Sequence, residues 1–282
     1  MAGTPRSLAA ALRDDGAAAL SVGCYRPPVD DATFARLENE NMIEWLRVSC
    51  GQVADAVVRA EGGVIAFGSG LPLALFNQAV VSDDDATDAG MTAAVRALGQ
   101  RGAPFYVVLR RGIDDRFGPV LKDLGLTLAD GILPGMALHP IPANPGSPAG
   151  HDIRRIRDAA GLDDHVRTVV AGFEIPESIV RPWVGEDLWR REACAVYVGY
   201  TDGHPVSSGL GVRSGRTIGV YNISTVETAR RRGYGAAMTA RVAADGAAAG
   251  CEVAILQASE MGRPVYERLG FRTVIGRDVY SG

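Results

Sequence analysis

The sequence is poor in cysteine and histidine, with four of each among 282 residues. The cysteines are scattered along the chain as Cys24, Cys50, Cys194 and Cys251. None belongs to a Cys-x-x-Cys pair or stands at metal-ligand spacing from a histidine, so we expect neither a disulfide framework nor a metal site. We expect reduced, mostly buried thiols, and we assign no chemistry to the widely spaced histidines.

Long apolar runs and an excess of basic residues are also missing. The apolar stretch at residues 8–20 is interrupted by Arg13, Asp14 and Asp15, so it predicts neither a signal peptide nor a membrane span. The formal net charge is −4, whereas proteins that bind nucleic acids usually carry clustered Lys and Arg. We therefore expect a cytoplasmic protein with no membrane or nucleic-acid partner.

The length suits two domains of about 140 residues each. Residues 139–148 contain four prolines, which stiffen a segment and forbid regular strand pairing, so they predict a linker. We place the first domain at residues 1–139, the linker at 140–150 and the second domain at 151–282.

Hydrophobic periodicity predicts helices and strands in both halves. In the first half, helices are expected at residues 4–20, 31–46, 87–100 and 116–124, and strands at 63–67, 74–81 and 104–109. In the second half, strands are expected at residues 153–156, 193–200, 205–212 and 253–256, and a helix at 159–172. Asp31 or Thr33 is the expected cap of the second helix.

The most informative stretch is residues 221–236, which begins as a strand and ends in an alanine-rich helix. Between the two lie Arg230, Arg231, Arg232, Gly233 and Gly235. A glycine-rich turn at a helix start predicts an anion site, because free backbone N–H groups and the positive helix end point at one spot. The arginines add charge for phosphate oxygens. The turn is neither a Walker A loop nor a dinucleotide fingerprint, and the alternative is an arginine-rich helix start on a solvated surface.

Two motifs in this half resemble those of the GCN5-related N-acetyltransferase (GNAT) superfamily. Residues 230–235 read Arg-x-x-Gly-x-Gly, similar to the family's (Gln/Arg)-x-x-Gly-x-(Gly/Ala) turn between the fourth strand and the third helix. Residues 263–271 contain Tyr266, Gly270 and Phe271, which look like the family's second signature, Tyr-x-x-x-Gly-Phe. The two motifs in this order make the resemblance specific, and it covers residues 150–282 well.

The resemblance implies that acetyl-CoA binds at the turn as the acetyl donor. The residues that would hold its pyrophosphate are Arg230, Arg231, Arg232, Gly233, Tyr234, Gly235 and Ala236. In the family, main-chain groups where the fourth strand leaves the fifth hold the pantetheine arm and polarise the thioester. These positions match Thr225, Val226 and Glu227, although many relatives have Pro in place of Glu227. Ser259 stands where many relatives have an Asn that contacts CoA, and it is expected to make a shorter contact.

Acetyl transfer to an amine also needs a proton for the leaving thiolate. The resemblance assigns this role to Tyr266, since a phenol is protonated at neutral pH; the alternative is that Tyr266 only packs between helix and sheet. The general base is less clearly marked. Glu174 lies in a loop that lines the acceptor site in the family, Glu227 lies near the donor, and a water relay is a third route. Four aromatic residues could form an apolar wall of the acceptor site: Phe173, Trp183, Trp189 and Tyr221. The alternative is that they pack in the core.

The two halves also resemble each other. Asn77 and Asn222 stand 145 positions apart (222 − 77), as do Gly125 and Gly270 (270 − 125). This constant offset indicates two copies of one unit, against the alternative of two unrelated α/β units. The expected fold class is therefore α/β (α+β), with two GNAT-like domains, each a mixed, mostly antiparallel twisted sheet flanked by helices.

The first copy lacks the features that would bind a phosphate. Aspartates occupy residues 83–85 and Asp88 stands opposite Gly233, so carboxylates would repel a pyrophosphate there. Leu121 stands opposite Tyr266 and cannot move a proton. We interpret residues 1–139 as a degenerate GNAT-like domain that binds no acetyl-CoA.

The leading functional hypothesis is an acetyl-CoA-dependent N-acetyltransferase. It would transfer an acetyl group to a primary amine of a small molecule by direct attack in a ternary complex, and a peptide or protein N-terminus is the other acceptor class. A non-catalytic acyl-CoA-binding sensor or partner protein is the alternative. A transferase that uses charged tRNA would need a basic groove, which the charge balance disfavours. Both a monomer and a homodimer are compatible with the sequence.

Overall fold

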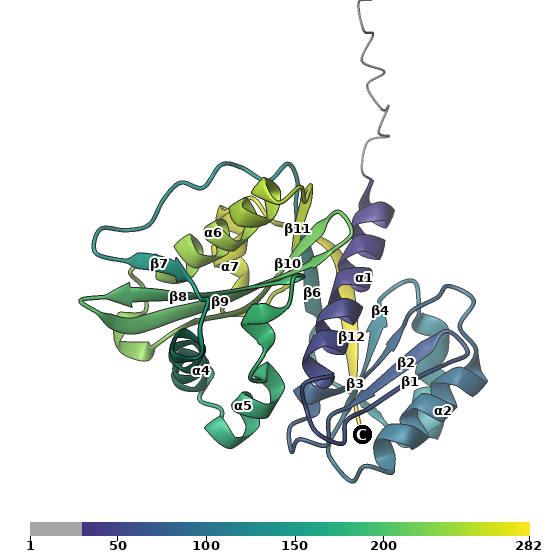
Figure 1. Cartoon of the computed structure of the whole chain (residues 1–282). Helices are drawn as coiled ribbons and strands as arrows, with labels where there is room; N and C mark the ends of the chain where they lie inside the picture. The colour runs from purple at the N-terminus through teal and green to yellow at the C-terminus, as the bar shows by residue number, and fades with distance from the viewer. Residues whose placement is uncertain (1–29) are drawn as a thin grey trace, which may run out of the picture.

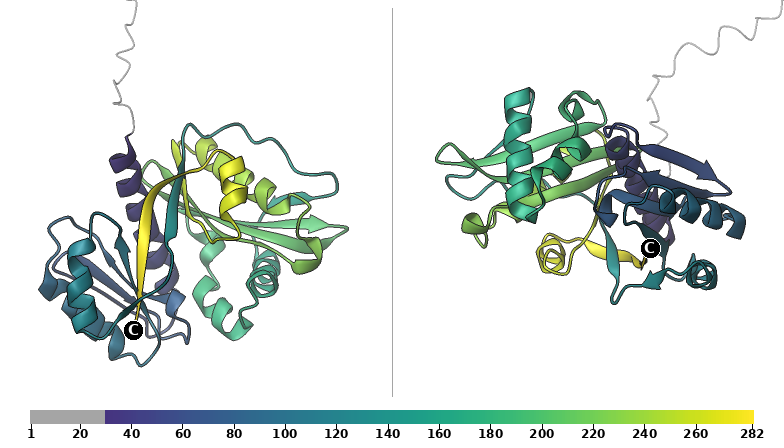
Figure 2. Two further views of the ribbon diagram at one scale, coloured as in Figure 1. Left: turned by 180° about the vertical axis from the view of Figure 1, so that it is seen from behind. Right: turned by 90° about the horizontal axis from the view of Figure 1, so that it is seen from below.

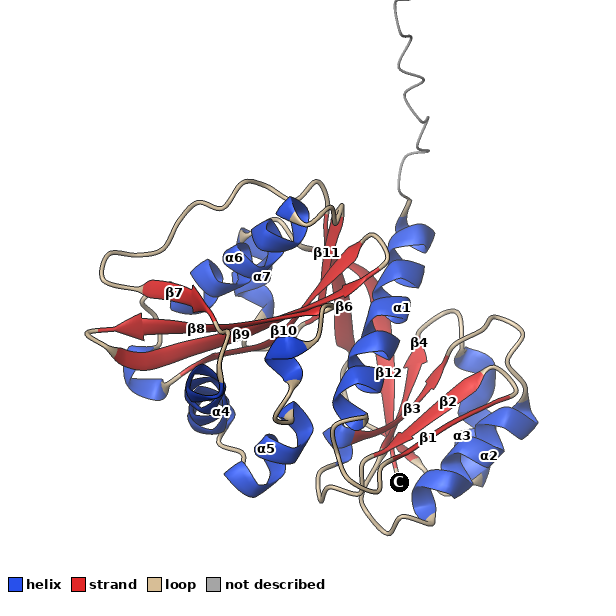
Figure 3. Ribbon diagram, viewed as in Figure 1, coloured by secondary structure: helices blue, strands red, loops and turns tan. Residues whose placement is uncertain are grey.

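The computed structural model describes residues 30–282. The predicted helix at residues 4–20 lies outside this range. In the described part, helices flank one large sheet (Figures 1 and 3).

The first half contains three helices, six strands and two short 3₁₀ turns within the described residues. Its elements are α1 Asp31–Cys50, β1 Val57–Glu61, β2 Val64–Gly68, η1 Ala74–Phe76, β3 Asn77–Val81, α2 Asp88–Gly99, β4 Tyr106–Arg110, η2 Asp115–Phe117, α3 Gly118–Asp123, β5 Thr127–Leu128 and β6 Leu133–Leu138. The predicted strand at residues 74–81 is wrong in its first three residues, which form the turn η1. Asp30, rather than Asp31 or Thr33, caps α1 by accepting a hydrogen bond from the Thr33 N–H at 2.8 Å.

The second half begins after a segment, residues 139–151, that contains no helix or strand. Its elements are β7 Asp152–Arg155, α4 Ala159–Phe173, α5 Glu177–Val184, η3 Leu188–Arg190, β8 Cys194–Thr201, β9 His204–Ser214, β10 Thr217–Thr225, η4 Glu227–Ala229, α6 Tyr234–Ala248, β11 Val253–Gln257, α7 Arg263–Arg268 and β12 Arg272–Ser281. Helices α6 and α7 lie on one face of the sheet, and α4 and α5 on the other (Figure 1).

The strands of both halves form one continuous sheet of 12 strands among the described residues, not the two separate sheets expected from the sequence. The order is β1-β2-β3-β4-β12-β6-β11-β10-β9-β8-β7, and β5 pairs with β12. Only the β3–β4 and β10–β11 pairs are parallel. The sheet is thus mixed and mostly antiparallel, as expected, but two separate domains are not evident in it.

The sheet is continuous because β6 and β12 each cross to the other half (Figure 2). Strand β6, from the first half, pairs with β11 of the second. Strand β12 pairs with β6 through its first part and with β4 through its last five residues. Sequence periodicity predicts that a segment is a strand but not which strand it pairs with, because pairing depends on contacts between residues far apart in the chain.

Helix α1 lies where the two halves meet and packs on strands of both. Its apolar side chains Phe34, Leu37, Trp45 and Leu46 join a core that also contains residues of α4, α5, β9 and β10. The Trp45 ring stacks on Tyr221 of β10, with ring centroids 5.1 Å apart. The first half therefore covers part of the second half's sheet.

A buried ion pair fixes α1 to β12. Glu38 and Arg277 both have fully buried side chains. The Arg277 Nε donates to Glu38 Oε1 at 3.1 Å, and its Nη2 donates to Glu38 Oε2 and to Asn39 Oδ1. Burying either charge alone would be costly, so the pair holds these two elements in one arrangement.

Removing one member of this pair should destabilise the protein strongly. We expect Glu38→Ala to lower the free energy of unfolding by about 3–5 kcal/mol, because Arg277 would keep a buried, uncompensated charge. The double variant Glu38→Leu/Arg277→Met should recover most of the loss. Urea unfolding followed by tryptophan fluorescence measures both, and a loss below about 1 kcal/mol in Glu38→Ala would contradict the prediction.

Candidate active site

The strands β10 and β11 separate part of the way along their length. They are paired in parallel from Thr217–Val253 to Gly219–Ile255, and no pairing is present beyond these residues. Strand β10 also has a bulge between Tyr221 and Ser224, where Asn222 takes a positive φ of 49°. We call the region between the two strands beyond these residues the gap; β10 borders it as far as Thr225, which precedes the turn before α6.

The turn presents free backbone donors at the start of α6. Gly233, with φ 82°, precedes the helix, and no side chain caps it. The first N–H groups of a helix have no partner within it, so those of Tyr234, Gly235 and Ala236 are available to an anion. Gly233 and the neighbouring Arg231 and Arg232 are exposed. This geometry fits the predicted pyrophosphate site.

Arg230 braces the turn from within the protein. Its guanidinium donates to the Thr225 carbonyl at 3.2 Å and to the Gly172 carbonyl at 3.1 Å. It also lies 3.9 Å from a Glu174 carboxylate oxygen. Arg230 therefore ties β10 and the end of α4 together, so its guanidinium is used inside the protein to order the turn.

The positions expected to hold the pantetheine arm already make hydrogen bonds inside the protein. The Val226 N–H donates to the Val206 carbonyl at 3.0 Å, and the Val226 carbonyl accepts from Ala229 at 2.9 Å. Glu227 is exposed and begins the turn η4 rather than capping α6. A carbonyl oxygen keeps a second lone pair for a ligand, and the role of Thr225, Val226 and Glu227 stays a prediction.

Tyr266 lies on α7, partly buried against the core between α6 and the sheet. Its ring lies 6.0 Å from that of Phe271, centroid to centroid. Burial raises the pKa of Tyr266 to about 12, so the phenol is protonated at neutral pH and can donate a proton. The packing alternative and the catalytic role both fit this position.

The other predicted residues are divided between exposed places and the core. The Ser259 hydroxyl accepts a hydrogen bond from the Gly262 N–H at 3.1 Å and so helps to form the start of α7. Glu174 ends α4 in the left-handed conformation, with φ 58°, and its side chain is 76% exposed. Trp183 and Tyr221 belong to the buried core and Trp189 is partly buried, whereas Phe173 is 48% exposed. The proposed aromatic wall is thus mainly core packing.

Sequence analysis missed His151, which packs against the turn. Its ring stacks on Tyr234, with centroids 4.1 Å apart, and its two nitrogens lie 2.6 Å from the Ser147 Oγ and 2.8 Å from the Ser207 Oγ. Burial lowers the pKa of His151, which favours the neutral ring. No local motif marks this histidine, because Tyr234 and Ser207 come from distant segments.

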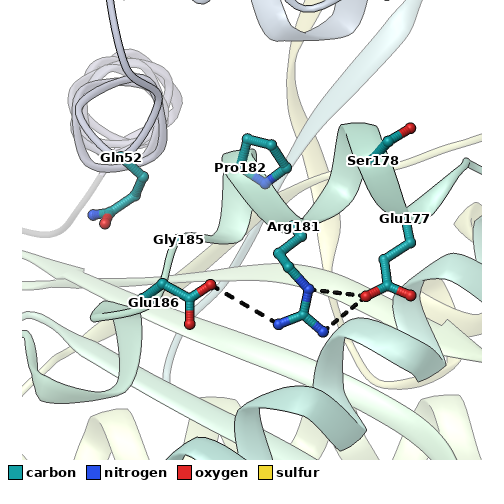
Figure 4. A pocket seen from close by; sticks show the side chains of 7 residues that line it. All are labelled: Gln52, Glu177, Ser178, Arg181, Pro182, Gly185 and Glu186. Atoms are coloured by element: carbon teal, nitrogen blue, oxygen red, sulfur yellow. Dashed lines mark hydrogen bonds and ion pairs between the residues drawn. The ribbon is translucent and has the colours of Figure 1, made fainter.

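A groove of about 560 Å³ runs along α5 (Figure 4). Its lining consists of Gln52, Glu177, Ser178, Arg181, Pro182, Gly185 and Glu186. Arg181 pairs with Glu177 and with Asp163 at 2.8 Å, and it lies 4.0 Å from Glu186. One guanidinium thus faces three carboxylates, so the groove carries a negative balance.

The described residues contain no cluster of three or more His, Cys, Asp or Glu side chains arranged to hold a metal ion. None of the helices in residues 30–282 combines the length and the apolarity needed to span a bilayer.

The separated parallel strands, the uncapped helix start and the tyrosine of α7 are the features that the resemblance to the GNAT superfamily predicts. Residues 152–260 match the family described as acetyltransferase (GNAT) domain. The second half of the chain is therefore similar to a GNAT acetyltransferase domain. No curated protein matches the sequence.

Solved structures show the same fold over most of the chain. A GCN5-related N-acetyltransferase from Kribbella flavida is 17% identical, with a TM-score of 0.66 over 88% of this chain and 94% of that one. A GCN5-related N-acetyltransferase from Sphaerobacter thermophilus is 17% identical, with a TM-score of 0.58 over 78% and 76%. A region of a fungal multi-domain β-N-acetylglucosaminidase, described as a glucosamine N-acetyltransferase, is 10% identical, with a TM-score of 0.58 over 91% of this chain and 37% of that one.

The brace formed by Arg230 should be measurable without any ligand. We expect Arg230→Met to lower the free energy of unfolding by about 1–3 kcal/mol, since two charge-assisted hydrogen bonds are lost. The matched control is Arg232→Met, an exposed arginine in the same turn, which should change stability by less than about 0.5 kcal/mol. Equal effects in urea unfolding would show that Arg230 does not brace the turn.

Proposed function

We propose that the protein transfers the acetyl group of acetyl-CoA to a primary amine, using only its second half. The observation that carries this proposal is the uncapped start of α6 at the wide end of the gap between β10 and β11. A pyrophosphate bound by the N–H groups of residues 234–236 directs the pantetheine arm along this gap. Arg231 and Arg232 add charge beside the phosphates.

The reaction proceeds by direct attack in a ternary complex. The amine lone pair attacks the thioester carbonyl carbon, and the C–S bond of the tetrahedral intermediate breaks. The leaving thiolate takes the phenolic proton of Tyr266, which solvent then replaces. The amine attacks as the neutral base, so an acceptor that binds as an ammonium first loses one proton to water or to a carboxylate, for which Glu174 is the candidate at the edge of the site. The nitrogen of the tetrahedral intermediate then loses a second proton to solvent.

The first half serves as a degenerate copy of the same unit in this proposal. The equivalent helix start, that of α2, is capped by the Thr87 side chain, which accepts from the Gly90 N–H at 3.1 Å. Asp88 adds a negative charge in the first turn of α2. The Thr87 cap occupies one of the free N–H groups of the helix start, and Asp88 would repel an anion. The first half therefore contributes structure rather than a second donor site.

The acceptor is a small, positively charged amine. The negative balance of the groove around Arg181 supports this choice, because it favours an ammonium group over an anion. The fold shared with a glucosamine N-acetyltransferase region makes glucosamine a reasonable first member of an amine panel.

Calorimetric titration with acetyl-CoA tests the number of donor sites. We expect one site per chain, and Gly233→Asp should weaken binding at least about 100-fold through strain and charge. Gly233→Ala separates the two causes: it shares the strained backbone at φ 82° but adds no charge, so it should bind better than the aspartate variant. Two sites per chain would contradict the degenerate first half, and no binding would contradict the proposed donor.

Tyr266→Phe tests the proton donor. We expect kcat to fall about 10²- to 10⁴-fold, while the Kd of acetyl-CoA stays unchanged, as measured by thiol release with the amine panel and by calorimetry. The acid form is needed and its pKa is about 12, so Tyr266 should cause no loss of rate as the pH rises from 7 to 10. Unchanged kcat in the variant would reduce Tyr266 to a packing residue.

A further inference from the structure

Tyr221 and Gln257 stand where β10 and β11 separate. The last paired residues are Gly219 and Ile255, and side chains two positions further along point to the same face of a strand. This face is the one covered by α1, because Tyr221 bonds to Asn41 and Gln257 bonds to Glu38. The two side chains therefore close the narrow end of the gap on the α1 side.

Hydrogen bonds fix which way the Gln257 amide points. Its Nε2 donates to Glu38 Oε1 at 2.5 Å, and Glu38 is held by Arg277. Burial raises the pKa of Tyr221 well above its ordinary value and Glu38 adds to the rise, whereas Arg277 and the Gln257 side chain oppose it.

The same chain of bonds continues into α1. The Tyr221 hydroxyl donates to Asn41 Oδ1 at 2.9 Å. The Asn41 amide in turn donates to the Val212 carbonyl at 3.0 Å and to Thr217 Oγ1 at 2.8 Å, which sets its own orientation. A flip of the Gln257 amide would break its bond to Glu38 and place the amide oxygen against a carboxylate, so the observed orientation is strongly favoured.

The consequence is a fixed acceptor at the gap. Because Nε2 is directed at the Glu38 carboxylate, Gln257 presents Oε1 to the other side, and this oxygen can only accept a hydrogen bond. No residue in the described part of the chain donates to this oxygen. Glu38 and Asn41 are fully buried, whereas Gln257 is only partly buried, so the polar chain reaches accessible space at Gln257.

We propose that Gln257 Oε1 accepts a hydrogen bond from an amide N–H of the pantetheine arm of the acyl donor, and that α1 of the first half holds it in place for this purpose. The arm carries secondary amides and would lie between β10 and β11, so an acceptor at the narrow end meets it close to the thioester. The first half thus positions the donor that the second half binds. This inference rests on the proposed function.

The test compares two ligands that differ in the pantetheine arm. In Gln257→Met, which has nearly the same shape and lacks the acceptor, we expect the Kd of acetyl-CoA to rise about five- to tenfold. The Kd of adenosine 3′,5′-bisphosphate, which has no pantetheine arm, should stay within about twofold. Gln78→Met, on β3 of the first half, is the matched control and should leave both values unchanged.

Each other outcome overturns the proposal in a distinct way. An unchanged Kd of acetyl-CoA in Gln257→Met shows that the oxygen makes no bond to the donor, while the proposed function stands. An equal weakening of both ligands shows a general disturbance of the site rather than a lost contact to the arm. If the wild-type protein binds neither ligand, the proposed function fails and this inference fails with it.

Discussion

The buried pair of Glu38 and Arg277 is the interaction on which the rest of the arrangement depends. It joins a helix near the start of the described chain to the last strand, 239 residues apart in sequence. An isolated charge at either place would carry a large desolvation cost, so the helix and the strand are stable only together. Around this pair β12 meets β6 and β4, and the sheets of the two halves become one.

The shape of the candidate active site depends on the place where β12 joins the two halves. The gap between β10 and β11 is closed on one face by α1 and flanked on the other by α6 and α7 (Figure 1). The phosphate turn itself needs little from the first half, because backbone N–H groups and Arg230 form it locally. The narrow end of the gap depends on both halves, since the side chains that line it are held by Glu38 and Asn41.

Local features were predictable from the sequence, and long-range ones were not. The turn at residues 230–236 and the motif that contains Tyr266 follow from glycines, arginines and aromatic residues close together in the chain. From the sequence, Glu38 is expected on the surface of an amphipathic helix. Its burial is explained only by its pairing with Arg277. The single sheet was missed for the same reason, since hydrophobic alternation identifies β6 and β12 as strands without naming their neighbours. His151 shows the same limit, because its ring meets Tyr234 and Ser207 only after folding.

The exchange of strands also sets an order of events during synthesis. Strand β4 leaves the ribosome long before β12, the strand that pairs with its open edge. Until β12 is made, the free edge of β4 is unpaired and Glu38 of α1 lacks its partner Arg277. Such an edge invites pairing with other chains. The sheet is completed only when residues 272–281 insert between the two halves.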